Sequence, residues 1–258
     1  MISKDKFPIL ERDDCENGII LTKFDDGTNI STKLPEKAVF LFLKEEVINN
    51  FVEKNGGIPL ALFKTVSKNY QPYVVKYKGQ EICVCQAGVG SAVSAKILDY
   101  LIGHGVKKVV ACGSCGVLEH IEEGAFIVPT KALRDEGVSY KYLPPSRFVE
   151  LDAEAISAIK KTFEELKIPY QECATWTTDS MYRETADMVE YRKQEGCKVV
   201  EMECASLASV ARFRKIKFGQ ILFTADSLAN AEKHDARNWG ADSHDTALEI
   251  CLEAILNF

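Results

Sequence analysis

Short apolar runs alternate with amphipathic stretches along most of this 258-residue chain. Runs rich in β-branched and aromatic residues predict strands, and apolar positions at helical spacing predict helices. The expected strands are 38–43, 73–77, 81–86, 106–112, 125–129, 170–177 and 218–225, and the expected helices are 44–54, 93–102, 152–166, 186–194 and 243–256. Strands that alternate with helices favour a single α/β domain with a mixed or largely parallel sheet.

The stretch 199–206 predicts a buried strand that ends at a carboxylate, where a helix begins. If the strand continued through Glu201 and Glu203, both side chains would point to the same side, because strand side chains alternate. A carboxylate at a strand end accepts two hydrogen bonds at once and is suited to hold a sugar diol. The simpler alternative is that Glu203 caps the next helix, because acids favour helix N-termini.

Two glycine-rich turns are expected at the ends of predicted strands. Gly88 and Gly90 lie between a predicted strand and a predicted helix, and the free N–H groups at a helix start favour an anion. The motif Cys-Gly-Ser-Cys-Gly at 112–116 predicts a second turn, on a neighbouring strand end and at the same edge of the sheet. The polar stretch 132–142 predicts a loop.

Composition and charge narrow the possible partners. The chain is 46% apolar and 27% charged, which is ordinary for a soluble globular protein. A formal charge of −6 argues against a nucleic-acid polymer as partner. No apolar run approaches the roughly 18 residues that cross a bilayer, so no membrane partner is expected. Nine cysteines without a visible secretory signal predict buried, reduced thiols in a cytoplasmic protein.

The cysteine spacing and the N-terminal stretch add two further expectations. Cys112 and Cys115 form a CxxC pair, but no second pair or histidine cluster follows, so no metal site is expected. Residues 1–37 are polar and predict an N-terminal arm or small hairpin before a main domain at 38–258. Within that arm, the sequence Asp-Asp-Gly at 25–27 predicts a turn.

Four motifs occur in an order and at a spacing that resemble one enzyme family. They are Ala-Gly-Val-Gly-Ser at 87–91, Cys-Gly-Ser-Cys-Gly at 112–116, Val-Glu-Met-Glu-Cys-Ala at 200–205 and Ala-Asp at 225–226. Over residues 38–258 the chain resembles the nucleoside phosphorylase-I superfamily, which includes purine nucleoside phosphorylases, uridine phosphorylases and methylthioadenosine nucleosidases. The resemblance implies a mixed, distorted central sheet flanked by helices, cleavage of a ribosyl N-glycosidic bond, no cofactor, and a homo-oligomer between dimer and hexamer.

The resemblance also implies roles for acidic residues. Glu203 matches the carboxylate that binds the ribose 2′- and 3′-hydroxyls, Met202 the residue packed beneath the sugar, and Glu201 the flanking acid. Asp226 matches the general acid that protonates a purine ring nitrogen, and Arg237 resembles the arginine that supports it. The residues alone leave two alternatives open. Asp226 could equally cap a helix, and Arg237 could equally be a solvated loop residue.

Met181 and Tyr182 match the positions that surround the base, with core packing as the alternative. Uridine-specific members carry a glutamine and an arginine shortly afterwards, and the stretch 183–187 lacks that pair. The resemblance therefore favours a purine nucleoside.

On the phosphate side the chain departs from the family pattern. Phosphorolytic members carry two arginines that this chain replaces, one of them with Ala111. The remaining matches are Gly88, Gly90 and Ser114, with Lys68 matching a basic residue that reaches over from a neighbouring subunit. Because lysine offers only a point charge, the loss of two bidentate arginines predicts weaker phosphate binding.

Phosphorolysis of a purine nucleoside, with phosphate as co-substrate, is the first expectation. The segment 42–47 faintly resembles the nucleosidase segment whose last glutamate positions water, so hydrolysis with Glu46 as base is one alternative. A surface helix would carry such an acid in any case. The alternative from another class is a nucleoside-binding protein that has kept the sugar site and lost catalysis.

Overall fold

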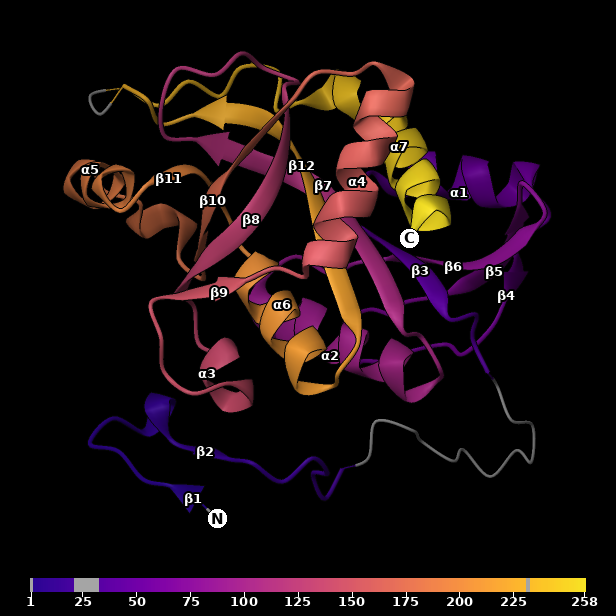
Figure 1. Cartoon of the computed structure of the whole chain (residues 1–258), viewed down its shortest axis with the longest axis horizontal. Coiled ribbons are helices and arrows are strands. Elements are labelled where there is room, and N and C mark those ends of the chain that lie inside the picture. Colours follow the sequence, from indigo (N-terminus) through magenta and orange to yellow (C-terminus); the bar gives the residue numbers. More distant parts are fainter. Residues whose placement is uncertain (1, 21–32, 231–232) are drawn as a thin grey trace.

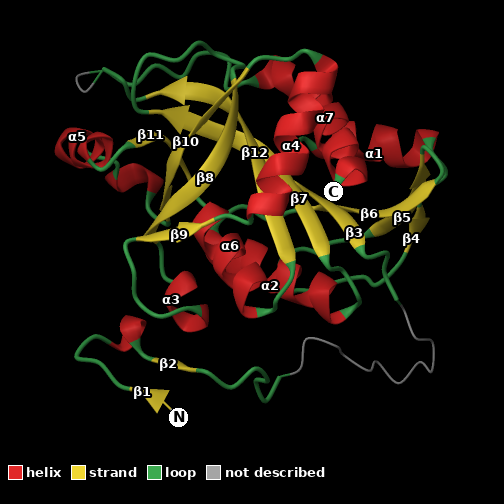
Figure 2. Ribbon diagram, viewed as in Figure 1, coloured by secondary structure: helices red, strands yellow, loops and turns green. Residues whose placement is uncertain are grey.

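The computed structural model describes residues 2–20, 33–230 and 233–258. Within them a ten-stranded sheet is flanked by helices, which confirms the α/β fold class (Figures 1 and 2). The strands are β1 (Ile2–Ser3), β2 (Arg12–Asp13), β3 (Lys37–Leu41), β4 (Ile58–Pro59), β5 (Tyr73–Tyr77), β6 (Gln80–Gln86), β7 (Lys108–Val117), β8 (Phe126–Asp135), β9 (Phe148–Glu150), β10 (Tyr170–Thr178), β11 (Cys197–Glu201) and β12 (Lys217–Ser227). The helices are α1 (Glu45–Lys54), α2 (Ser91–Gly103), α3 (Ser139–Tyr142), α4 (Ala153–Leu166), α5 (Ala186–Gln194), α6 (Cys204–Phe213) and α7 (His244–Asn257), with short 3-10 turns at Pro8–Leu10, Met181–Arg183 and Ala241–Ser243.

The sheet is mixed and bends back on itself. Its strands follow the order β11-β10-β8-β12-β7-β3-β6-β5-β4, and β9 pairs with β8 beside this path. β7 and β12 run parallel, whereas β12 and β8 run antiparallel. β11 also pairs with β7, Val199 opposite Val117, so the path from β11 through β10, β8 and β12 to β7 closes into a ring. This closure is the distortion that the family resemblance implies.

Helices cover both faces of the sheet (Figure 2). Side chains of α1, α4 and α7 share one hydrophobic core with the sheet, and those of α2 and α6 share another. In β3, Val39 and Leu41 enter the first core, whereas Ala38 and Phe40 enter the second, because strand side chains alternate. A strand covered on both faces is apolar throughout, which explains the continuous apolar run at 38–43.

The turn predicted at 112–116 is wrong, because β7 continues through it to Val117. These residues pair with β12 and then with β11, so the strand has partners along this whole segment. The glycines serve close packing instead. A Cβ atom on Gly113 would lie 2.8 Å from the Phe42 Cβ, and one on Gly116 would lie 2.9 Å from the Leu228 Cδ1. The strand end is also not adjacent to that of β6, because β3 lies between them.

The loop predicted at 132–142 is wrong at both ends, because β8 continues to Asp135 and pairs with β10, and α3 begins at Ser139. Arg134 is buried within this strand. Its guanidinium donates to the Ser139 hydroxyl at 2.9 Å and to the Pro144 carbonyl at 2.7 Å. A strand tolerates a buried arginine when its N–H groups find acceptors, and the local pattern does not reveal such tertiary contacts.

Other elements follow the prediction closely. α5 has the predicted bounds, and β5 and β6 form the predicted antiparallel hairpin. α4 begins directly after Asp152, whose carboxylate accepts hydrogen bonds from the N–H groups of Glu154 at 3.1 Å and Ala155 at 3.2 Å. Asp152 is therefore the N-cap that the sequence predicts.

The N-terminal residues form a separate two-stranded sheet, in which β1 and β2 pair antiparallel. It lies beside α3 (Figure 1), and the Lys141 ammonium donates to the carbonyls of Pro8 at 2.6 Å and Glu11 at 2.9 Å. The turn expected at 25–27 lies outside the described residues. The division of the chain into an arm and a main domain stays a prediction.

The cysteines are free thiols, and all but Cys15 are buried. The exposed thiol of Cys15 corrects the expectation of buried thiols throughout. Among the residues that the structure describes, none of the helices has both the length and the apolar character needed to cross a membrane.

Candidate active site

Glu201, the last residue of β11, holds the start of α6 in place. One of its carboxylate oxygens, Oε2, accepts hydrogen bonds from the N–H groups of Glu203 at 2.7 Å and Cys204 at 2.6 Å. The other, Oε1, accepts from the hydroxyls of Thr177 at 2.6 Å and Thr175 at 3.2 Å. Glu201 therefore satisfies the free donors of the helix start, a role that one alternative gave to Glu203.

Glu203 occupies the N-cap position of α6, but its side chain makes no capping bond there. Its Oε1 instead accepts a hydrogen bond from the N–H of Gly90, at 2.5 Å, and the side chain is 7% exposed. Gly90 precedes α2 and has a φ of 94°, in the region that favours glycine. The Ser91 hydroxyl donates to the Met202 carbonyl at 2.7 Å, which joins the same two segments again. The N-terminus of α2, which is distant in sequence, thus holds the Glu203 side chain in place.

Burial and hydrogen bonds act in opposite directions on the pKa values of the two carboxyl groups. The Thr177 hydroxyl accepts from the N–H of Ala205 at 3.0 Å, so its own hydrogen is free to point to Glu201. Two N–H groups and two hydroxyls can therefore stabilise the ionised form of Glu201. Burial nevertheless raises the pKa of Glu201 above its ordinary value, and these donors only oppose that shift. Burial, followed by repulsion from Glu201, raises the pKa of Glu203 to about 8.

Asp226 lies near the end of β12, and its partner is a histidine that the sequence pattern did not single out. Its Oδ2 lies 2.8 Å from the Nε2 of His234. The Arg237 guanidinium, which was expected to support Asp226, donates to the carbonyl of Ile121 at 2.7 Å and to that of Ala225 at 3.5 Å. Within the described residues, no ion pair joins Arg237 to Asp226.

A cavity of about 240 Å³, here called the inner cavity, collects half of the predicted site residues. Its lining residues are Phe42, Val89, Gly113, Ser114, Cys115, Gly116, Met181, Glu184, Val200, Glu201, Met202, Glu203, Gln220, Ala225, Asp226 and Trp239. The strand ends of β7, β11 and β12 supply much of this wall. The lining contains four acids and, among the described residues, neither lysine nor arginine.

A second cavity of about 260 Å³, the outer cavity, shares Met181, Glu184 and Asp226 with the first. Tyr182 and His234 line only this outer part, and Tyr182 is largely exposed. Burial, followed by the charge of Asp226, raises the pKa of Glu184 to about 7. Sequence reasoning missed Glu184, because an acid in a short polar stretch carries no local sign of burial.

Other predicted residues lie outside the inner cavity. Lys68 borders a separate small cavity, where its ammonium lies 3.0 Å from the Gln86 Oε1 and 3.8 Å from a Glu45 carboxylate oxygen. Gly88 packs tightly, since a Cβ atom there would lie 2.6 Å from the Tyr70 hydroxyl oxygen. Glu46 is exposed on α1 and lines neither the inner nor the outer cavity.

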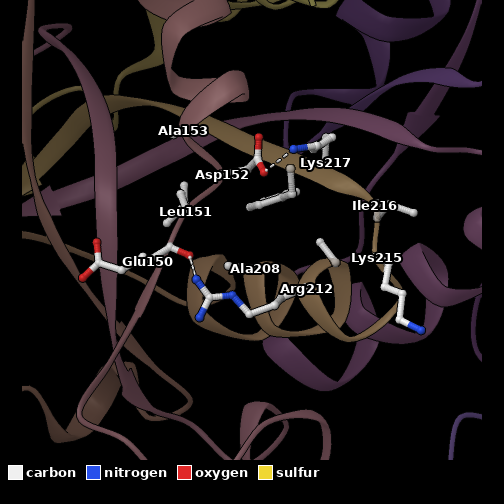
Figure 3. A pocket seen from close by; sticks show the side chains of 11 residues that line it. Glu150, Leu151, Asp152, Ala153, Ala208, Arg212, Lys215, Ile216 and Lys217 are labelled. Atoms are coloured by element: carbon white, nitrogen blue, oxygen red, sulfur yellow. Dashed lines mark hydrogen bonds and ion pairs between the residues drawn. The ribbon is translucent and has the colours of Figure 1, made fainter.

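A further cavity, of about 400 Å³, lies elsewhere, between the end of α6 and the start of β12 (Figure 3). Its cations are engaged: Lys217 pairs with Asp152 at 3.1 Å, and Lys215 pairs with Glu16 at 2.6 Å. The Arg212 guanidinium donates to the Glu150 carbonyl at 3.1 Å. Size alone favours this cavity, but the inner cavity holds the buried, interacting acids that mark sites of chemistry. We therefore assign the candidate active site to the inner cavity.

No group of three or more histidine, cysteine or acidic side chains in the described ranges is arranged to hold a metal ion. The inner cavity itself offers the chemistry of carboxyl groups. They accept hydrogen bonds, carry negative charge and transfer protons.

Comparison with known proteins identifies the family. Residues 38–257 match the model of the phosphorylase superfamily. The purine nucleoside phosphorylase of Plasmodium vivax is 29% identical over 159 residues, which cover 60% of this chain and 65% of that enzyme. The fold is similar to purine nucleoside phosphorylase from Toxoplasma gondii (TM-score 0.76, 20% identity, 93% of this chain and 97% of that chain). It is also similar to uridine phosphorylase from Vibrio fischeri (TM-score 0.75, 22% identity, 88% and 95%). The chain spans slightly less than two thirds of the Plasmodium vivax enzyme, and its family match places it in the phosphorylase superfamily.

Proposed function

We propose that this enzyme cleaves the N-glycosidic bond of a purine nucleoside by phosphorolysis, giving the free base and ribose 1-phosphate. The observation that carries the proposal is that Glu203 and Asp226, from separate segments of the chain, line the same cavity. A sugar-binding carboxylate and an acid for the leaving base are the two groups that this reaction requires. The name of the Plasmodium vivax relative supports the purine assignment.

In this proposal Glu203 accepts hydrogen bonds from the ribose 2′- and 3′-hydroxyls, and Met202 packs against the sugar. Glu201 positions Glu203 by fixing the N–H of that residue and the start of α6. As the bond to the base breaks, positive charge develops on the ribosyl group. A fixed carboxylate beside that charge stabilises the transition state more than the ground state.

Asp226 is the proposed general acid. Protonation of the purine N7 turns the departing base into a neutral leaving group, and Asp226 lies where the inner and outer cavities meet. Met181 and Tyr182 would flank the base. Glu184 lines both cavities beside Asp226 and is a further candidate for contact with the base edge. A pyrimidine has no N7, so this arrangement favours purines.

The proposed nucleophile side consists of Ser114 and the turn with Gly88 and Gly90. The N–H of Gly90 already donates to Glu203, and Ser114 is the residue of this set that lines the inner cavity. Lys68 would act on the site of a second copy of the chain, as the family resemblance implies.

Hydrolysis is the second candidate function, and the charge of the inner cavity favours it. The described lining supplies no lysine or arginine to attract a phosphate dianion, whereas a neutral water molecule needs no such cation. The proposed base Glu46 lies outside that lining, so hydrolysis would need another residue to activate water.

One experiment separates these reactions. The purified protein is incubated with inosine, adenosine, guanosine and uridine, with and without phosphate, and the products are separated. Base and ribose 1-phosphate formed only with phosphate support phosphorolysis, whereas base and free ribose formed without phosphate support hydrolysis. Nucleoside binding without turnover in either condition would contradict both reactions and support a nucleoside-binding protein without catalysis.

Asp226→Asn provides the matched variant. We expect it to lower purine cleavage at least about 100-fold, because an amide gives no proton to the base. Nucleoside binding, measured by calorimetry, should change little, because Glu203 is untouched. Equal cleavage rates in the variant and the native enzyme would remove Asp226 from the mechanism.

A further inference from the structure

The loop after β12 returns His234 to Asp226. Ser227 and Asp235 exchange two backbone hydrogen bonds, at 2.8 and 3.0 Å, which places the preceding residue His234 beside Asp226. The Nε2 of His234 lies 2.8 Å from the Asp226 Oδ2. Arg237 anchors the same loop through the Ile121 carbonyl at 2.7 Å. Two separate sets of hydrogen bonds therefore hold this loop so that the His234 ring contacts the Asp226 carboxyl group.

The two side chains differ in their access to water. The Asp226 side chain is 17% exposed and lines the inner cavity, whereas the His234 side chain is 48% exposed and lines the outer cavity. The His234 ring lies 5.7 Å, between centroids, from that of Trp239, which also lines the inner cavity. The pair thus connects the reaction cavity to solvent.

A histidine at this position has a chemical consequence that an arginine lacks. An arginine guanidinium keeps its protons in proteins, so it only holds a carboxylate in place. An imidazole both donates a hydrogen bond and exchanges protons with water near neutral pH. The arginine of this loop is engaged by backbone carbonyls, and the histidine contacts the acid.

We propose that His234 is a positioning residue that orients Asp226 and renews its proton from solvent during purine release, an inference that rests on the proposed function. Asp226 gives its proton to the purine N7 while the bond from C1′ to N9 breaks and its electron pair stays on the base. The resulting carboxylate accepts a hydrogen bond from the Nε2–H of the His234 imidazolium. The imidazolium then passes that proton to Asp226 and takes one from water, so one proton leaves with the base and one enters from solvent.

The test uses a nucleoside whose base leaves without a proton. In 7-methylinosine the methyl group already makes the base cationic, so the departing base is neutral without Asp226. We expect His234→Ala to lower kcat for inosine by about 30-fold with little change in KM, which is less than the full contribution of a general acid because Asp226 itself remains. With 7-methylinosine the loss should be less than about threefold, because this substrate bypasses the proton.

His234→Gln is the conservative variant. Its amide nitrogen donates to Asp226 but does not exchange a proton as imidazole does, so kcat for inosine should lie between those of the native enzyme and His234→Ala. Equal losses of kcat with inosine and 7-methylinosine in both variants would mean a merely structural role and overturn the inference. An unchanged kcat for inosine would overturn it as well. If the native enzyme cleaves neither nucleoside, the proposed function itself fails, which is a distinct outcome.

Discussion

The two sides of the inner cavity differ in how completely the fold satisfies their polar groups. On the proposed sugar side, four donors fix Glu201, and the N–H of Gly90 holds Glu203. On the proposed nucleophile side, the Ser114 hydroxyl has no hydrogen-bond partner within the described residues, and no lysine or arginine lines the wall there. The sugar side is therefore preorganised by the folded chain, whereas the nucleophile side depends on what binds to it.

The largest expected effect is on the sugar side. Glu203→Gln keeps the shape and the contact with Gly90 but removes the negative charge. We expect kcat/KM for inosine to fall by at least about 100-fold, because charged hydrogen bonds to the sugar are worth about 3 kcal/mol in total. The control substrate is 3′-deoxyinosine, which the native enzyme should cleave poorly and the variant should not distinguish from inosine. A variant that still prefers inosine would show that Glu203 does not read the 3′-hydroxyl.

The same variant tests the protonation of Glu203. Its pKa is raised above the ordinary 4.5, so the ionised form that accepts two hydroxyls gains population as pH rises through the raised value. KM for inosine should fall over that range in the native enzyme and stay flat in Glu203→Gln. The free energy of unfolding should fall over the same pH range in which substrate binding improves. The reason is that a pKa raised in the folded state means that the folded protein binds the proton more tightly than the unfolded chain does. The native protein should lose stability relative to the variant as pH rises from 4.5.

The next effect concerns the support of Glu201. Thr177→Val removes the hydroxyl that donates to Glu201 at 2.6 Å and accepts from the N–H of Ala205. We expect the free energy of unfolding, measured with urea, to fall by about 2 kcal/mol, because a buried carboxylate and a buried N–H each lose a partner. The matched control Thr175→Val removes one longer bond, at 3.2 Å, and should cost about 1 kcal/mol or less. Equal decreases in the free energy of unfolding of the two variants would contradict the larger role given to the Thr177 hydroxyl.

The smallest effect is expected on the nucleophile side. Ser114→Ala removes one neutral hydroxyl from the wall, so KM for phosphate should rise about fivefold, as the loss of about 1 kcal/mol implies. KM for the nucleoside should stay within about twofold, because Glu203 and its donors are untouched. A large loss in nucleoside binding would instead place Ser114 on the sugar side and remove the contrast between the two sides.

The sequence predicted the elements that depend on local pattern. The strand that ends at Glu201, the helix that follows it and the Asp152 cap all form as expected, because periodicity and capping act over a few residues. The glycine pattern at 112–116 was misread as a turn. Glycine permits both turns and close packing, and only the positions of Phe42 and Leu228 decide between them.

In the candidate site, too, local motifs predicted some features and tertiary contacts set the others. The motifs named Glu203, Met202, Ser114 and Asp226, and the fold brings all four to one cavity. Arg237 was assigned to Asp226 from its place in the loop, and the structure gives that contact to His234. Spacing along a loop does not determine which side chain contacts Asp226. That contact depends on the backbone pairing of Ser227 with Asp235.

The sequence alone determined the family, the α/β class and the acids on which the proposed reaction depends, because these follow from ordered motifs and local periodicity. The tertiary structure decided that Glu201 rather than Glu203 accepts the hydrogen bonds at the start of α6, and that both carboxyl groups are buried. It also decided that Glu184 and His234 flank Asp226. The chemistry of a carboxyl group depends on its surroundings, and those are assembled only when the chain folds.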